Sequence, residues 1–340
     1  MIQHTRLAVA SVALGVSLIL APASHAQTRY TAVDLGGPPG SNANHAGLIN
    51  DRGEGAGITG TPSIATVWTR DGIVALGSLG PPQTDSLARG INKRGDVVGD
   101  SAFISGWPYT RHGFLWRDGV LTDLGTLAGK TDSYAAAIND HGDIAGTSYT
   151  PGRGTQIVLW RNGTITDLGQ AGGSDAVVTG MNNRRQIIGY AVFGSFSRPF
   201  IWQDGVFTYL PALSDATYPW AINDRGEIAG SASFDDGTQR AVLWRDGAII
   251  DLGRLPGSRY TSALGINDHG QVVGFALNPD IRTYRAFVWE DGRTTELPPL
   301  PGSPWAVAAA INNHGEIVGF GPNARDDGHL AIMWIPTKGR

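Results

Sequence analysis

The sequence has no cysteine, few charged residues and, beyond its first 21 positions, no long hydrophobic run. The absence of cysteine excludes disulfides, thiol catalysis and cysteine-ligated zinc or iron–sulfur centres. Charged residues make up 16% of the chain, against an average of about 25%. The formal net charge is −4, and lysine occurs only at positions 93, 130 and 338. Because nucleic-acid binding depends on neutralising phosphates with basic residues, we expect no nucleic-acid partner.

The one long apolar run lies at the N-terminus. Met1–Arg6 carries positive charge, Leu7–Ala21 is almost uninterruptedly apolar, and Ser24–Ala26 supplies small residues for a cleavage site. This order is typical of a secretory signal peptide, cleaved here before Gln27. The alternative, a membrane anchor, needs about 20 apolar residues. We therefore expect residues 1–26 to be removed and the protein to be secreted or periplasmic, with no membrane span.

The rest of the chain is built from one repeated unit. The pattern Ile-Asn-x-x-Gly-x-(Ile/Val)-x-Gly recurs seven times, 41 to 47 residues apart, between Tyr30 and Pro336, with one substitution in the first copy and two in the fourth. Its asparagine is present in every copy: Asn50, Asn92, Asn139, Asn182, Asn223, Asn267 and Asn312. A tryptophan recurs at the same period: Trp68, Trp116, Trp160, Trp202, Trp244, Trp289 and Trp334. Two anchors that share one period indicate a repeat architecture.

Each unit is predicted to form four short strands, because apolar residues alternate and turn residues bound each segment. The motif Trp-x-(Asp/Asn)-Gly predicts a type I′ hairpin, and Asn-x-x-Gly predicts a type I turn with left-handed glycine. In the fourth copy Arg185 replaces that glycine, so we expect backbone strain of about 1–2 kcal/mol there. In the third copy the predicted strands are Ser133–Ile138, Asp143–Ser148, Gln156–Arg161 and Thr164–Leu168.

A period in the low to mid forties with four strands is typical of a β-propeller blade. The first strand, Tyr30–Gly36, has no Trp strand before it, and the last Trp strand, Leu330–Ile335, has no strand after it. Pairing of these two strands would close a ring and remove a free sheet edge. The sequence therefore predicts an all-β fold: a seven-bladed β-propeller of four-stranded blades, closed by this pairing, as a single domain over residues 27–340. We expect a monomer.

The order of strands within a blade follows from side-chain size. Small residues, as in Ala135–Ala137 and Ala308–Ala310, precede each repeated asparagine, so this strand is predicted to lie innermost, where space is least. Both tight turns of each blade then lie on one face, the hairpin face. The opposite face, the variable-loop face, receives the loop before each Trp strand and the crossover to the next blade.

The repeats resemble the HAF-repeat family of secreted bacterial proteins. The resemblance is carried by segments such as Phe114–Gly119, Thr122–Leu127 and Ala137–Asp140, and a degenerate form of the family's triplet is present as His112–Phe114. It covers all seven units and implies an exported β-repeat protein. It implies no catalytic residues.

Most of the repeated polar residues are interpreted as structural. Each asparagine is expected to cap its own turn, and each tryptophan is expected to pack between blades. The turn tips carry His141, His269, His314 or arginine, and acids two residues further on are expected to neutralise them. The chain has no His-Glu-x-x-His motif and no calcium-loop pattern, so we expect no metal and no other cofactor.

Residues that depart from the repeat are better candidates for function, since binding residues concentrate in loops on a rigid scaffold. Aromatic rings can stack on sugars, and arginine can grip carboxylates with two parallel hydrogen bonds. The candidate ligand-binding residues lie on the variable-loop face: Trp107, Tyr109, Arg111, His112, Arg198, Tyr218, Arg259, Tyr260, Arg282, Tyr284, Arg285 and Trp305.

Two functions stay open on this basis. The favoured one is an exported binding or interaction module for an extracellular glycan, another polymer or a protein. The alternative is an extracellular polysaccharide lyase or hydrolase that uses His112 or His329 with a tyrosine and an arginine. Convergence of such a cluster within hydrogen-bond reach would favour the enzyme. A shallow aromatic face without it would favour binding.

Overall fold

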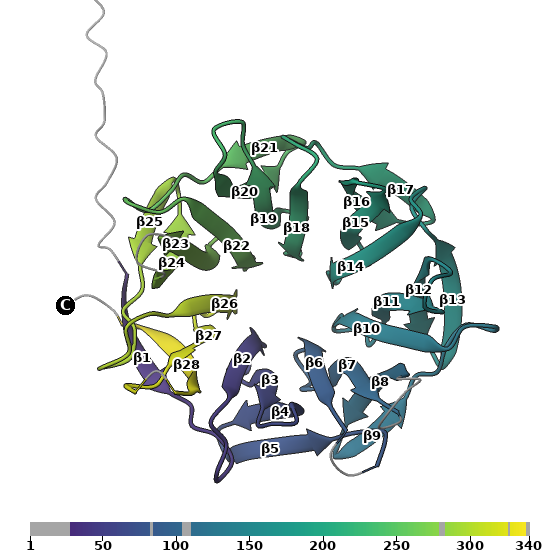
Figure 1. The fold of residues 1–340 in the computed structure, drawn as a ribbon, viewed down its shortest axis with the longest axis horizontal. Helices are drawn as coiled ribbons and strands as arrows, with labels where there is room; N and C mark the ends of the chain where they lie inside the picture. Colours follow the sequence, from purple (N-terminus) through teal and green to yellow (C-terminus); the bar gives the residue numbers. More distant parts are fainter. Residues whose placement is uncertain (1–27, 82–83, 104–109, 279–282, 326, 338–340) are drawn as a thin grey trace, which may run out of the picture.

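The computed structural model describes residues 28–81, 84–103, 110–278, 283–325 and 327–337. In this part of the chain there are 28 strands and no helix. The strands form seven four-stranded blades arranged around a central axis (Figure 1). Blades 5 and 6 are joined by one parallel strand contact, Gln239 to Tyr260. The expected signal peptide and the candidates Trp107, Tyr109 and Arg282 lie outside the described residues.

Within each blade the strands follow one another outward from the axis, and neighbours are antiparallel. The innermost strands of blades 1 to 7 are β2 (Asn44–Ile49), β6 (Ser86–Ile91), β10 (Asp132–Ile138), β14 (Asp175–Met181), β18 (Thr217–Ile222), β22 (Tyr260–Ile266) and β26 (Val307–Ile311). The second strands are β3 (Gly55–Thr59), β7 (Val97–Ala102), β11 (Ile144–Tyr149), β15 (Ile187–Phe193), β19 (Ile228–Ser233), β23 (Val272–Asn278) and β27 (Ile317–Pro322).

The two outer layers contain the Trp strand and the strand that follows it. The Trp strands are β4 (Ile64–Thr69), β8 (Arg111–Arg117), β12 (Thr155–Arg161), β16 (Phe196–Gln203), β20 (Gln239–Arg245), β24 (Thr283–Glu290) and β28 (His329–Thr337). The outermost strands are β5 (Gly72–Gly77), β9 (Val120–Asp123), β13 (Thr164–Gly169), β17 (Val206–Tyr209), β21 (Ala248–Asp251), β25 (Arg293–Glu296) and, in blade 7, β1 (Arg29–Asp34). The four strands expected in the third repeat match β10 to β13 within one residue at each end.

Blade 7 combines the two ends of the chain. Strand β1 pairs antiparallel with β28, from Arg29 opposite Thr337 to Asp34 opposite Ile332. On the other side of β28 lie β27 and β26. The N-terminal strand therefore occupies the outer position that the last repeat does not fill by itself.

The turns take the backbone conformations that the sequence predicts. The Asp or Asn before glycine in five hairpins has a φ of 48° to 52°: Asp118, Asn162, Asp204, Asp246 and Asp291. Arg185 has a φ of 59°, in the left-handed region that costs a side chain energy. Its Nε donates a hydrogen bond to Asp143 of blade 3 at 2.5 Å. This contact helps to retain a strained residue where the other blades have glycine.

A β-bulge interrupts each innermost strand at the same place, for example between Ala135 and Ala137. Opposite the bulge, the second strand always has glycine: Gly57, Gly99, Gly146, Gly189, Gly230, Gly274 and Gly319. A Cβ atom at any of these positions would lie 1.8 to 2.1 Å from a backbone carbonyl oxygen of the innermost strand. The last glycine of the repeat is therefore required by strand packing, not by a turn.

The hydrophobic core lies in layers between neighbouring blades. Ala145 and Ile157 of blade 3, for example, pack with Ile187 and Trp202 of blade 4. Four of the repeated tryptophans donate an Nε1 hydrogen bond to a carbonyl of the chain as it leaves the preceding blade: Trp68 to Gly36, Trp160 to Leu124, Trp244 to Pro211 and Trp334 to Pro298. The prediction that the tryptophans pack between blades is confirmed.

Candidate functional site

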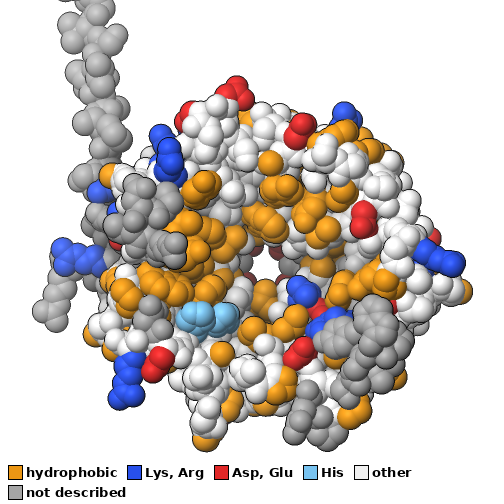
Figure 2. All heavy atoms as spheres, viewed as in Figure 1, with side chains coloured by type: hydrophobic (Ala, Val, Ile, Leu, Met, Phe, Trp, Pro, Cys, Tyr) orange, Lys and Arg blue, Asp and Glu red, His pale blue; other side chains and the backbone are white. Residues whose placement is uncertain are grey.

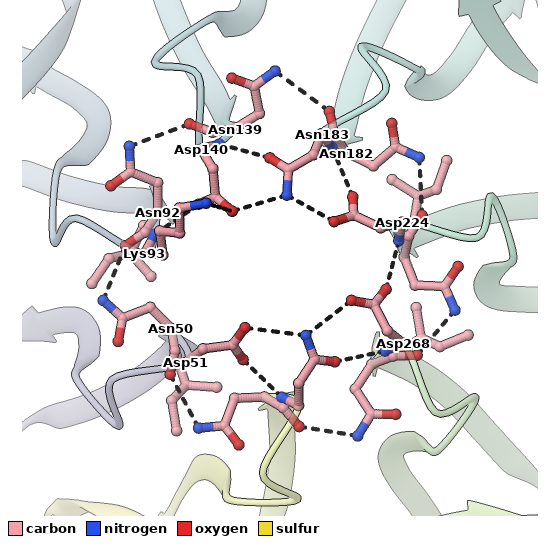
Figure 3. Close-up of a pocket in the computed structure, with 18 of the residues that line it drawn as sticks. Asn50, Asp51, Asn92, Lys93, Asn139, Asp140, Asn182, Asn183, Asp224 and Asp268 are labelled. Carbon is pink, nitrogen blue, oxygen red and sulfur yellow. Dashed lines mark hydrogen bonds and ion pairs between the residues drawn. The ribbon is translucent and has the colours of Figure 1, made fainter.

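The hairpin end of the ring axis holds a polar cavity of about 170 Å³, lined by the seven Ile-Asn turns (Figure 3). The seven repeated asparagines, here called the asparagine ring, are all buried. Each Oδ1 accepts hydrogen bonds from the backbone N–H groups two and four residues further on, as from Arg184 and Gln186 to Asn182. The predicted capping role is therefore confirmed.

The same asparagines also join the blades, which the sequence analysis did not predict. Each Nδ2 donates to the backbone carbonyl of the equivalent asparagine in the next blade, at 2.9 to 3.5 Å. The last of these bonds runs from Asn312 of blade 7 to Asn50 of blade 1. Seven side chains thus form a continuous chain of hydrogen bonds around the axis.

A second polar layer lies beside the asparagine ring and consists of the next residue in each turn: Asp51, Lys93, Asp140, Asn183, Asp224, Asp268 and Asn313. Asn183 donates its two amide hydrogens to the carboxylates of Asp140 and Asp224. Asn313 does the same for Asp51 and Asp268. Each of these two amides thus bridges two carboxylates of neighbouring turns, so these polar groups hydrogen-bond to one another.

The tips of the turns are also paired. Burial alone would raise the pKa of Asp96, but hydrogen bonds from Arg117, Asn92 and Arg94 lower it to about 2. The predicted neutralisation of tip arginines by acids two residues further on is confirmed in three blades: Arg52 with Glu54, Arg94 with Asp96 and Arg225 with Glu227. The charges at these three turn tips are therefore largely neutralised within the protein.

The variable-loop end of the axis differs in character. Figure 2 looks onto this face and shows hydrophobic side chains around a central opening, with histidine beside it. On the innermost and second strands, this end is formed by three positions, counted from the repeated asparagine: five before it, three before it and eight after it. We call the end of the channel that they surround the mouth. The aromatic residues at these positions are His45, Tyr134, Tyr190, Tyr218, Trp220, Phe275 and Phe320. Tyr284 and Trp305 also belong to the mouth, because their rings contact Phe275 and Phe320.

The densest part of the mouth joins blades 6, 7 and 1. The ring of Tyr284 lies 5.4 Å from that of Trp305, which lies 5.5 Å from His329. A 2.7 Å hydrogen bond joins Nδ1 of His329 to Nε2 of His45. His45 in turn stacks on Phe320, with ring centroids 4.3 Å apart and planes 9° apart. Residues 284 positions apart in the sequence thus form one aromatic cluster.

Further aromatic pairs continue around the mouth. Tyr190 of blade 4 contacts Tyr218 of blade 5 edge-on at 5.0 Å. In blade 3 the Tyr149 hydroxyl donates to the Tyr134 hydroxyl at 2.9 Å. Burial raises the pKa of Tyr149 and of Tyr190, so both hydroxyls stay neutral and can act as donors at physiological pH.

Blade 2 contributes charge instead of an aromatic ring. Asp100, at one of the three mouth positions, is fully buried. It accepts hydrogen bonds from Arg89 on the adjacent strand and from Nε of Arg111, the latter at 2.5 Å. Arg111 is itself only 8% exposed. Of the two arginines, Arg89 is the one that reaches solvent, with 42% of its side chain exposed.

The structure brings three of the predicted site residues to the mouth: Tyr218, Tyr284 and Trp305. The other described candidates are placed elsewhere or are engaged by protein groups. Arg111 is buried on Asp100, and His112 pairs with Asp123 at 2.9 Å. Arg285 bonds Glu296 and the Pro256 carbonyl.

Three described candidates remain: Arg198, Arg259 and Tyr260. Arg198 stands over the rings of Phe193, Phe196 and Tyr209 at 5.4 to 5.9 Å. Arg259 and Tyr260 are exposed where the chain enters blade 6. Six aromatic mouth residues are absent from the predicted set: His45, Tyr134, Tyr190, Trp220, Phe275 and Phe320. Their fixed offset from the repeated asparagine is the signal that could have found them.

The condition set for an enzyme is not met in the residues that the structure describes. His112 contacts Asp123 and lies 4.9 Å from the ring of Phe103. His329 bonds His45 and is surrounded by Phe320 and Trp305. Within the described ranges no tyrosine or arginine hydrogen-bonds either histidine.

The described residues contain neither a group of metal-ligating side chains nor a membrane-crossing helix. No three His, Asp or Glu side chains in those ranges are placed to hold a metal ion together. No helix there has the length and apolar character needed to cross a membrane.

The chain is similar in fold to solved β-propellers. The β-propeller domain of the Trilobed protease from Pyrococcus furiosus matches with a TM-score of 0.56 and 11% identity, over 86% of this chain and 95% of that one. Streptogramin B lyase matches with 0.54 and 10%, over 91% and 98%. YCF48 bound to the D1 peptide matches with 0.53 and 13%, over 91% and 96%. No family model and no curated protein sequence matches the chain. The fold thus defines a β-propeller.

Proposed function

We propose that this protein is an exported binding module whose mouth holds an extracellular glycan or a similar polymer. The observation that carries the proposal is the convergence of aromatic side chains from blades 3 to 7 at equivalent positions around one opening. Packing of the blades near the axis favours small residues, so it does not account for the large aromatic side chains that recur there. Ligand stacking supplies it.

The chemistry of the mouth fits an extended, ring-containing ligand. Sugar rings present apolar faces that pack on aromatic side chains. The hydroxyl groups of the sugar can form hydrogen bonds with protein hydroxyls around the mouth. Tyr284 and Trp305 provide such faces in blades 6 and 7, and Tyr218 with Trp220 provide them in blade 5. Several weak contacts on one rigid ring add up for a polymer that spans them.

Two further features support export and binding over catalysis. The N-terminal pattern of a signal peptide and the resemblance to HAF-repeat proteins both imply export. Among propellers of similar fold, one carries the name of a lyase and another is bound to a peptide, so fold alone does not choose. Among the described residues, neither His112 nor His329 has a tyrosine or an arginine as a hydrogen-bond partner, so the cluster that the enzyme alternative needs is not assembled there.

The test is calorimetric titration of the purified protein against a panel of soluble oligosaccharides, with product analysis of each mixture. We expect one or more glycans to bind without being cleaved. Trp305→Ala removes a stacking face and is expected to weaken binding about 10-fold. Val206→Ala is the control, because this exposed residue lies at the hairpin end of the outermost strand of blade 4, away from the mouth.

Three results would contradict the proposal. One is binding that Trp305→Ala leaves unchanged or that Val206→Ala weakens equally. Another is the appearance of cleaved products, which would favour the lyase or hydrolase. The third is an absence of any retained glycan, which would direct the search to a protein ligand. Thermal melting of both variants serves to exclude loss of folding as the cause.

A further inference from the structure

A groove of about 710 Å³ lies between blades 3 and 4 on the variable-loop face. Its walls come from β10, β11 and β14, and the loop after β11 forms its rim. One lining residue, Arg89, comes from β6 of blade 2. The groove begins at the mouth, because Tyr134 belongs to both.

Arg89 is held in place by one of its nitrogens. Its Nε donates to the buried carboxylate of Asp100, and its guanidinium lies 5.5 Å over the ring of Tyr134. No hydrogen bond from its two terminal nitrogens is formed to any residue in the described ranges. An arginine fixed by a buried acid, with its terminal N–H groups left over, is pre-organised to grip a carboxylate.

The remaining lining suits a sugar. Six of the side chains that line the groove have a hydroxyl: Tyr134, Thr147, Tyr149, Thr150, Thr155 and Ser174. The Tyr134 hydroxyl accepts from Tyr149, which leaves its own hydrogen to be donated to a ligand. The two tyrosine rings lie 5.4 Å apart and tilted by 30°, so they present a broad aromatic surface.

The charges near the groove favour an anion over a cation. Lys130 reaches the rim with an Nζ hydrogen bond to the Gly154 carbonyl at 3.4 Å, and Arg153 is exposed in the same loop. Asp175 is the one exposed acid that lines the groove. At the surface of the groove, Arg89 and two neighbouring cations therefore outnumber the one exposed acid, while Asp100, the partner of Arg89, is buried.

We propose that this groove is a subsite for a carboxylated sugar, a uronate unit of an acidic polysaccharide. Arg89 grips the sugar carboxylate, Tyr134 and Tyr149 pack against the ring, and the threonine and serine hydroxyls pair with the ring hydroxyls. This inference rests on the proposed function and narrows its ligand to an acidic glycan. An acidic peptide would also satisfy Arg89, but it would bring no sugar ring to pack on the surface of Tyr134 and Tyr149.

The experiment compares trigalacturonate with its methyl ester in calorimetric titrations of the full protein. The free acid is expected to bind at least about 10-fold more tightly, because only it offers a charged acceptor to arginine. Arg89→Gln should remove this preference, and Arg89→Lys should restore part of it. Arg161→Gln is the matched control: it removes an exposed arginine at the hairpin end of blade 3 and should change nothing.

Each outcome bears on one of the two claims. Equal affinity for the acid and the ester, or unchanged binding by Arg89→Gln, overturns the uronate subsite. The proposed function is still supported in that case if a neutral glycan binds and its binding depends on Trp305. Equal binding of a poly-glutamate peptide overturns the assignment to a sugar. Preference for a sulfated trisaccharide over trigalacturonate overturns the assignment to a carboxylate. No binding of any glycan overturns the proposed function itself.

Discussion

The asparagine side chain explains why one residue type recurs in all seven units. Its oxygen accepts two hydrogen bonds from its own turn, and its amide donates both to the side chain four residues on and to the next blade. Aspartate would lose the donor, and serine would lack the reach and the second hydrogen. The sequence showed the local half of this role. The half between blades joins residues more than 40 positions apart and needed the structure.

A second residue-scale feature lies where blade 7 meets blade 1. Burial and the nearby charge of His329 lower the pKa of His45 from 6.5 to about 4. The pair comes from the two ends of the chain, and His329 also donates its backbone N–H to Asn42 at 2.8 Å. A proton on His45 therefore opposes a contact that joins the first and last blades.

The free energy of unfolding should fall as the pH falls from about 6.5 toward 4. The unfolded chain binds a proton on His45 near pH 6.5, whereas the folded protein resists it until about pH 4. Because the pair is partly exposed and screened by solvent, we expect a loss of about 1 kcal/mol. Urea unfolding at pH 7 and pH 4.5 measures it.

The control for this prediction is a histidine outside the pair. His45→Gln should reduce the acid sensitivity, and His314→Gln, at an exposed turn tip on the hairpin face, should leave it as in the wild type. Equal sensitivity in His45→Gln and wild type would assign the effect to other groups.

At the scale of the strand, the important element is the bulged innermost strand with glycine opposite it. The bulge brings a carbonyl of the innermost strand against the Cα of its neighbour, as with His45 and Gly57. Alternation and turn signals predicted the four strands of each blade. They did not predict the bulge, because a bulge depends on how two strands pack and not on the periodicity of either.

Substitution of Gly57 by alanine is expected to lower the free energy of unfolding by at least about 2 kcal/mol, since its Cβ would lie 1.9 Å from the His45 carbonyl oxygen. Gly47→Ala, in the innermost strand of the same blade, has open space around its Cβ. It should be neutral or stabilise by up to about 1 kcal/mol. Equal urea midpoints for the two variants would show that the bulge relaxes.

At the scale of the whole molecule, the two faces of the ring differ in their side chains. The hairpin face is closed by the asparagine ring and its paired tips, whereas the variable-loop face carries the aromatic mouth and the groove with Arg89. The sequence predicted the faces and placed Tyr218, Tyr284 and Trp305 on the second one. It also proposed Arg111 and Arg285, whose partners Asp100 and Glu296 lie on neighbouring strands.

The remaining mouth residues were not predicted as binding residues, because the predicted candidates came from segments that depart from the repeat. His45, Tyr134 and Phe275 lie within regular strands and look like ordinary strand residues. Only the ring geometry brings their side chains together, as it does for Asn312 and Asn50. Contacts of that range follow from closure of the seven repeats and not from any local pattern.

The central claim is that ligand binds at the mouth and that the hairpin end is structural. Hydrogen exchange of the protein with and without the glycan retained in the panel tests it directly. We predict that protection increases in residues 43–46, 132–135, 217–220 and 303–307 and stays unchanged in the turns at 50–54, 139–143 and 267–271. Protection confined to those turns would contradict the account.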